Sequence, residues 1–161
     1  MTPPDDAGND LHWRTGDAQQ VTPIDVIDEA MIQRLVHAFY GKVRVDAELG
    51  PIFAARVVDW GPHIERMCAF WSSVMLRTSR YDGRPMQKHA PLPIGAAHFD
   101  RWLALFAATA QEVCPAVVAA QFIARARMIA ASLEFGIATH RGQQLSAGER
   151  LPPLASLSDP A

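Results

Sequence analysis

Apolar residues recur at steps of three and four through four long segments of this 161-residue chain. The first segment begins after Asp28, whose carboxylate can cap a helix, and others run over about 59–76, 96–113 and from 115 onward. The apolar positions of the first segment are Ile32, Leu35, Val36, Phe39, Tyr40 and Val43. No bounded run alternates between apolar and polar residues, as a half-buried strand would. The sequence therefore predicts an all-α fold with four main helices.

The connections between these segments are rich in helix breakers. Residues 46–53 are expected to form a turn with a short helical piece, because Gly50-Pro51 should stop regular structure there. Residues 77–95 contain Gly83, Pro85, Pro91, Pro93 and Gly95. We therefore expect at most a single helical turn in that stretch, around residues 86–89.

Both ends of the chain differ in composition from its middle. Residues 1–22 and 141–161 are rich in proline, glycine and polar residues and lack apolar periodicity. We therefore expect a disordered N-terminal extension over 1–22, one folded domain over 23–140 and a flexible C-terminal tail over 141–161.

The charge balance and the cysteines exclude several classes of protein. The 15 Lys and Arg against 17 Asp and Glu give a net charge of −2 without a basic block, so nucleic acid is not expected as a partner. No segment reaches the ~20 uninterrupted apolar residues of a membrane span, and the N-terminus does not resemble a signal peptide. We expect a cytoplasmic protein without a membrane partner. Cys68 and Cys114 form no CxxC pair, which excludes a disulfide framework or a cysteine zinc site.

Four side chains carry most of the chemical information: Tyr40, His63, His89 and Trp102. They lie on or beside aromatic-rich stripes, a pattern that suits a buried flat cofactor better than an ordinary core. Each also has a structural explanation. His89 could be a solvated loop residue, the Tyr40 hydroxyl could reach water, and His63 and Trp102 could belong to the core.

The choice of cofactor is not fixed by these residues alone. An imidazole suits iron, copper and zinc, but the histidines show no HxxxH or HxH spacing for zinc. The nucleophile elbow of hydrolases, the Walker phosphate loop and GxGxxG are also missing from the sequence.

Five segments, taken in order, give the chain a resemblance to a known family. They are LVHAFYGKVRVDAELGPIF at 35–53, WGPHIERMCAFW at 60–71, YDGRPMQKHAPLP at 81–93, HFDRWLALF at 98–106 and ARMIAASL at 126–133. Together they resemble the truncated haemoglobins, in particular group III, and the lack of a Gly-Gly pair agrees with that branch.

The resemblance implies a globin-like fold, a two-over-two helical sandwich around haem b. His89 would be the proximal ligand of a five-coordinate iron. On the opposite face, Tyr40 and Trp102 would donate hydrogen bonds to a bound gas, while His63 would lie at the distal entrance as a gate or a donor through water. Direct binding of His63 to the iron is the less favoured alternative.

The resemblance also implies which apolar side chains would form the walls of the haem pocket. These cofactor-binding residues are Phe53, Met67, Phe70, Trp71, Leu92 and Phe99. Most are equally well explained as core residues. Arg84 or Lys88 could pair with the haem propionates or remain solvated.

The function implied is that of a bacterial-type oxygen-binding haem protein, as in oxygen transport, which also binds NO and CO. NO dioxygenase or peroxidase turnover, with peroxide as a ligand, would require a separate reductase, because the sequence contains no flavin or nicotinamide module. The alternative is an all-α gas or redox sensor, or an interaction module, that uses haem only structurally or has lost it.

Overall fold

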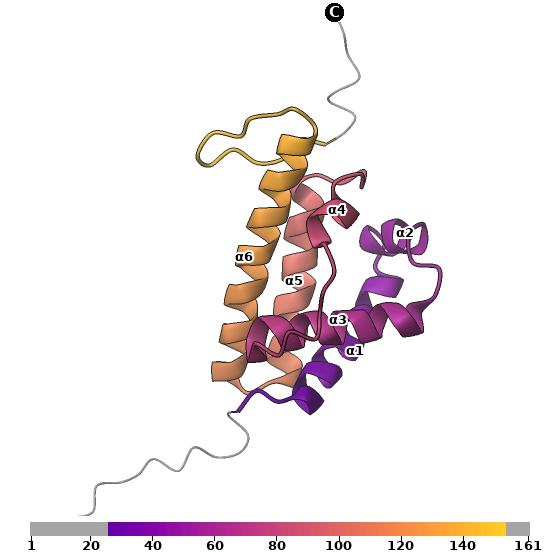
Figure 1. Ribbon diagram of the computed structural model, residues 1–161, viewed down its shortest axis with the longest axis vertical. Coiled ribbons are helices and arrows are strands. Elements are labelled where there is room, and N and C mark those ends of the chain that lie inside the picture. Colours follow the sequence, from indigo (N-terminus) through magenta and orange to yellow (C-terminus); the bar gives the residue numbers. More distant parts are fainter. Residues whose placement is uncertain (1–25, 154–161) are drawn as a thin grey trace, which may run out of the picture.

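A computed structural model describes residues 26–153 of the chain, and every regular element within this range is a helix (Figure 1). The elements are α1 (Glu29–Val45), α2 (Leu49–Ala54), α3 (Trp60–Leu76), α4 (Pro85–His89), α5 (Ala96–Val113) and α6 (Ala116–His140). The predicted all-α fold with four main helices is confirmed over this range. The extension predicted for residues 1–22 lies outside the described residues.

Two of the long helices, α1 and α3, begin where an aspartate side chain satisfies one of their first free N–H groups. Asp28 Oδ1 accepts from Met31 N at 2.8 Å at the start of α1, and Asp59 Oδ1 accepts from Gly61 N at 3.1 Å at the start of α3. Sequence patterns therefore located these two starts to within about one residue.

The expectation that Gly50-Pro51 stops regular structure was wrong. Both residues lie inside α2, which begins at Leu49. Proline is tolerated there because the first N–H groups of a helix have no partner within the helix, so the N–H that proline lacks is not missed.

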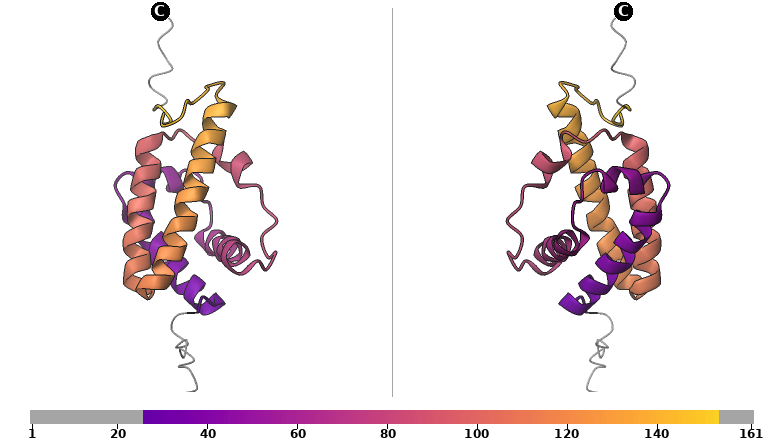
Figure 2. Two further views of the ribbon diagram at one scale, coloured as in Figure 1. Left: turned by 90° about the vertical axis from the view of Figure 1, so that its left-hand side faces the viewer. Right: turned by 90° about the vertical axis from the view of Figure 1, so that its right-hand side faces the viewer.

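The long helices form two pairs, which is the expected two-over-two arrangement. α1 packs along α3, α5 packs along α6, and contacts between α1 and α5 join the pairs. α3 runs across the direction of α5 and α6 (Figures 1 and 2). The largest fully buried side chains of the shared core are Phe39, Phe106 and Phe122.

Packing continues beyond the end of α6. Leu151 is 1% exposed and belongs to a second apolar cluster with Ile94, Phe99 and Ile137. Residues 141–153, part of the segment assigned from sequence to a C-terminal tail, thus pack against the helices, and residues 154–161 are not described.

Among the helices of residues 26–153, α6 alone is long and apolar enough to cross a membrane. The same property is found in core helices of globular domains. Because α6 packs along α5 and also contacts α4, we assign it to the core of this domain.

Candidate functional site

An aromatic cluster joins α1, α2 and the start of α3. The Tyr40 ring lies edge-on to His63, with ring centroids 5.2 Å apart, and to Phe53 at 5.9 Å. The Trp60 ring contacts Tyr40 and His63, with ring centroids 6.0 Å and 5.6 Å apart, respectively. Two of the predicted distal residues, Tyr40 and His63, are therefore direct neighbours.

Phe39 connects this cluster to the third predicted distal residue. Its ring lies 5.1 Å from that of Tyr40 and 5.5 Å from that of Trp102 on α5. Trp102 in turn stacks on Phe106 at 5.4 Å. The fold thus brings Tyr40, His63 and Trp102 from three helices to one region.

His89 is the last residue of the short helix α4 and is half-buried. Its Nδ1 donates to the Pro85 carbonyl at 2.7 Å if the proton is on that nitrogen, which leaves Nε2 as the free nitrogen. Pro85 begins the same turn, so the helix that carries the imidazole also fixes its ring.

His63 is held as a neutral imidazole. Burial lowers its pKa, and the positive charge of Arg66 lowers it further. Its Nε2 is buried and has no hydrogen-bond partner within residues 26–153. A buried polar atom without a partner is unusual and indicates that a ligand or water belongs beside it.

The lowered pKa of His63 gives a prediction for stability. As pH falls from about 6.5 through the lower folded-state value, the unfolded chain takes up a proton that folded His63 resists. The free energy of unfolding should therefore decrease over this range, and His63→Gln should reduce the decrease. Urea unfolding of the wild type and of His63→Gln, both without haem, at pH 7 and pH 5.5 measures this decrease. If both proteins lost the same free energy of unfolding, the lowered pKa could not be assigned to His63.

The six predicted wall residues fall into two groups. Phe53, Met67, Phe70 and Leu92 are half-buried. Trp71 is almost fully buried and stacks on Phe106 at 4.9 Å, and Phe99 is buried in the second apolar cluster. The first group is available to a ligand, whereas the other two are already surrounded by protein.

The position of Phe53 on α2 depends on a buried carboxylate. Asp46 Oδ1 accepts from Leu49 N at 2.9 Å, and Asp46 Oδ2 accepts from Arg101 Nε at 2.9 Å. The Arg101 guanidinium and the backbone N–H groups hold the pKa of Asp46 below its usual range. This contact attaches the start of α2 to α5.

A profile of the bacterial-like globin family matches residues 25–133, which is more than half of the chain. The chain belongs to the bacterial-like globins. It is 32% identical over 115 residues to the group 3 truncated haemoglobin of Campylobacter jejuni, with 68% of this chain and 91% of that protein covered. The prediction of a group III truncated haemoglobin is thereby confirmed.

Solved globin structures share the fold of this globin. The crystal structure of the Campylobacter jejuni group III truncated haemoglobin matches with a TM-score of 0.64 at 33% identity, over 67% of this chain and 89% of that chain. The haemoglobin of Chloroflexus aurantiacus gives a TM-score of 0.57 at 26% identity, over 68% and 93%. The haemoglobin of Thermobifida fusca gives 0.55 at 28% identity, over 65% and 89%.

Membership of the globin family implies a haem cofactor, and the residues present fit one between α3 and α4. His89 keeps one ring nitrogen free while the other is engaged, as metal-ligating histidines do. His63 Nε2 is buried and has no hydrogen-bond partner in the described part of the chain. In addition, α3 packs on α1 and α4 on α6, but α3 and α4 do not pack extensively on each other.

The sequence interpretation missed Phe39 and Trp60 as members of the site. Trp60 precedes His63 by three residues, a spacing that places both on one face of a helix. The Arg44 guanidinium lies over the Trp60 ring, 4.8 Å from the ring centroid. Arg84 and Lys88, suggested as propionate partners, are both exposed at α4.

Proposed function

We propose that this globin binds dioxygen, and also NO and CO, at haem b held by His89. Bound haem supplies a ferrous iron with one coordination position open to a small ligand. Two observations carry the proposal: one ring nitrogen of His89 is fixed on Pro85, and His63 Nε2 is buried and has no hydrogen-bond partner among residues 26–153. These residues lie on α4 and α3, two helices without extensive mutual packing.

Tyr40 is suited to donate a hydrogen bond to a diatomic ligand. Burial raises the pKa of its hydroxyl well above the usual range, so the hydroxyl keeps its proton at neutral pH. Trp102 Nε1 can only donate, and so it favours a ligand that carries negative charge. Together the two donors would favour dioxygen, because both can stabilise negative charge on a bound ligand.

We expect the rings around His63 to limit the access of water to the distal side. Because burial and neighbouring charge lower the pKa of His63, it remains neutral near pH 7 and can donate through one nitrogen only. Phe53 and Trp60 stack at 6.2 Å next to it and close this side with apolar surface. We expect His63 to act as a gate or a donor rather than as an iron ligand.

We also propose that the same site oxidises NO or reduces peroxide. Either reaction needs electrons to return the iron to its ferrous state. We expect turnover only when a separate reductase is supplied. Steady NO consumption with a flavoprotein reductase, absent when the reductase is left out, measures this activity.

Haem titration tests the proposed function. Addition of haem to the purified protein should give a sharp Soret band that saturates at one haem per chain, and reduction in air should give a stable oxygenated spectrum. A protein that takes up no haem, or whose reduced form oxidises at once without binding oxygen, would refute the proposal.

A further inference from the structure

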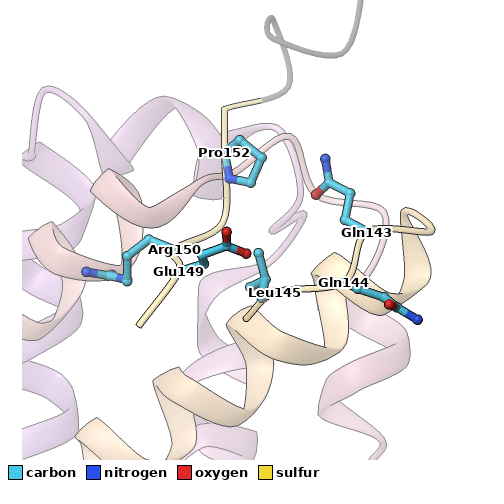
Figure 3. A pocket seen from close by; sticks show the side chains of 6 residues that line it. All are labelled: Gln143, Gln144, Leu145, Glu149, Arg150 and Pro152. Carbon is cyan, nitrogen blue, oxygen red and sulfur yellow. The ribbon is translucent and has the colours of Figure 1, made fainter. Parts of the chain in front are cut away.

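The segment that follows α6 forms a strap over the loop between α4 and α5. Residues 141–153, here called the C-terminal strap, leave the end of α6, arc outward and return (Figures 1 and 2). The loop beneath it, residues 90–95, is called the proximal loop. The middle of the strap stands around an open hollow of about 390 Å³ (Figure 3), lined by Gln143, Gln144, Leu145, Glu149, Arg150 and Pro152. Leu145 packs against the second apolar cluster, and the hydrogen bonds described below hold the two ends of the strap.

The first anchor is Arg141. Its Nη2 donates to the carbonyl oxygens of Leu92 at 2.9 Å and Ile94 at 2.8 Å, both in the proximal loop. No carboxylate pairs with Arg141 in the part of the chain that the structure covers. The charged donor is thus directed at the backbone of the loop.

The second anchor lies at the far end of the strap. The Leu151 carbonyl accepts from Ala96 N at 2.9 Å, at the start of α5, and Leu151 N donates to Glu134 Oε1 on α6 at 2.8 Å. Arg150 Nε donates to the same carboxylate oxygen at 2.8 Å. The Leu151 side chain is buried against Ile94. These contacts fix the strap to both helices that flank it.

The strap crosses the proximal loop at Gly95. A Cβ atom at this position would lie 3.2 Å from Pro153 Cα and 3.3 Å from Pro153 N, which is tighter than ordinary contact. Glycine therefore allows the two backbones to approach each other closely, and the loop is confined on that side.

The clamped carbonyls are connected directly to the segment that carries His89. Leu92 N donates to the His89 carbonyl at 3.0 Å, and Ile94 N donates to the Leu92 carbonyl at 2.9 Å. The Arg141 guanidinium, which holds the carbonyls of Leu92 and Ile94, thus restrains the turn that follows His89. The family profile ends at residue 133, so the strap lies outside the matched region.

We propose that the C-terminal strap positions the proximal histidine, with Arg141 as the positioning residue. The proposal rests on the proposed function, in which His89 holds the haem. Without the hydrogen bonds from Arg141, the proximal loop would move and His89 would sample orientations that do not suit the iron. Haem would then dissociate faster. Arg141 acts only through the backbone of residues 92–94.

The test compares Arg141→Gln with Arg127→Gln, which removes the same charge from an exposed position on α6. Hydrogen exchange of the full-length protein without added haem should be roughly tenfold faster across residues 90–96 in Arg141→Gln, since two hydrogen bonds from a charged donor are lost. Transfer of haem to an excess of apomyoglobin should also be roughly tenfold faster. Arg141→Lys, which can still donate to a carbonyl, should restore part of both effects.

The possible results distinguish a failure of the positioning role from a failure of the proposed function. Exchange across residues 90–96 that is the same in Arg141→Gln and wild type would overturn the role of the strap, as would haem transfer no faster than in Arg127→Gln. If the wild-type protein takes up no haem, the proposed function fails and the positioning role fails with it. In that event, faster hydrogen exchange in Arg141→Gln would still establish that Arg141 holds the proximal loop in place.

Discussion

Replacement of His89 by glycine is expected to weaken haem binding by more than about a hundredfold. Loss of a partner that merely orients a metal ligand costs about 10–100-fold in affinity, and loss of the ligand should cost more. The effect should be specific, because His89 is only half-buried and ends a five-residue helix that contains no fully buried residue. Haem titration followed by Soret absorbance measures the change in affinity.

A small molecule can replace the deleted side chain. Imidazole added to the His89→Gly variant should occupy the vacated position and restore a five-coordinate ferrous spectrum. His140→Gly is the matched control. His140 is exposed at the end of α6, so this variant should bind haem as the wild type does. If His89→Gly retained wild-type affinity and spectrum, another residue would have to be the ligand.

Tyr40→Phe and Trp102→Phe should each accelerate the release of oxygen by about ten- to a hundredfold. Each substitution removes one hydrogen-bond donor to a ligand with negative character, and a charge-assisted donor contributes about 1.5–3 kcal/mol. The phenylalanine ring preserves most of the packing on Phe39. Stopped-flow displacement of oxygen by excess CO measures the release rate.

Tyr81→Phe controls for the general effect of losing a tyrosine hydroxyl. Tyr81 packs on Phe70 at 5.3 Å, outside the cluster formed by Tyr40, His63 and Phe53, so its hydroxyl should not affect release. Unchanged release rates in both Tyr40→Phe and Trp102→Phe would refute ligand stabilisation by these donors. The same acceleration in Tyr81→Phe would point to a nonspecific effect.

Much of the helical framework could be predicted from sequence because its signals are local. Asp28 and Asp59 cap the helices that follow them, and apolar periodicity identifies the buried face of each helix. α2 was harder to predict because a Gly-Pro pair fits either a turn or a first helical turn. The contact of Asp46 with Arg101, 55 residues away in sequence, helps to hold that helix and leaves no local signal.

The site was only partly predictable for the same reason. Spacing places Trp60, His63, Met67 and Trp71 along one helix, but it does not reveal which of them meets other rings. Trp71 stacks on Phe106 and contacts Phe122 in the core, whereas Met67 remains half-buried. Burial of this kind depends on partners from distant helices, which one sequence does not identify.

The C-terminal strap shows the same limit more strongly. Residues 141–153 have the composition of a flexible tail, rich in Gly, Gln and Pro. Their packing depends on Leu151 and on two arginines, Arg141 and Arg150, whose partners lie 11–54 residues away in sequence. Composition describes the segment, but long-range contacts decide its structure.

We propose that His89 binds the haem iron and that the opposite face of the haem stays open to small ligands. Resonance Raman spectroscopy of the deoxygenated ferrous protein is the decisive measurement. We expect a five-coordinate spectrum with an iron–imidazole stretch that is lost in His89→Gly. Added imidazole should restore the stretch at a frequency that shifts when the imidazole is labelled with ¹⁵N. A stretch that persists in His89→Gly, or a six-coordinate bis-histidine spectrum in the wild type, would contradict it.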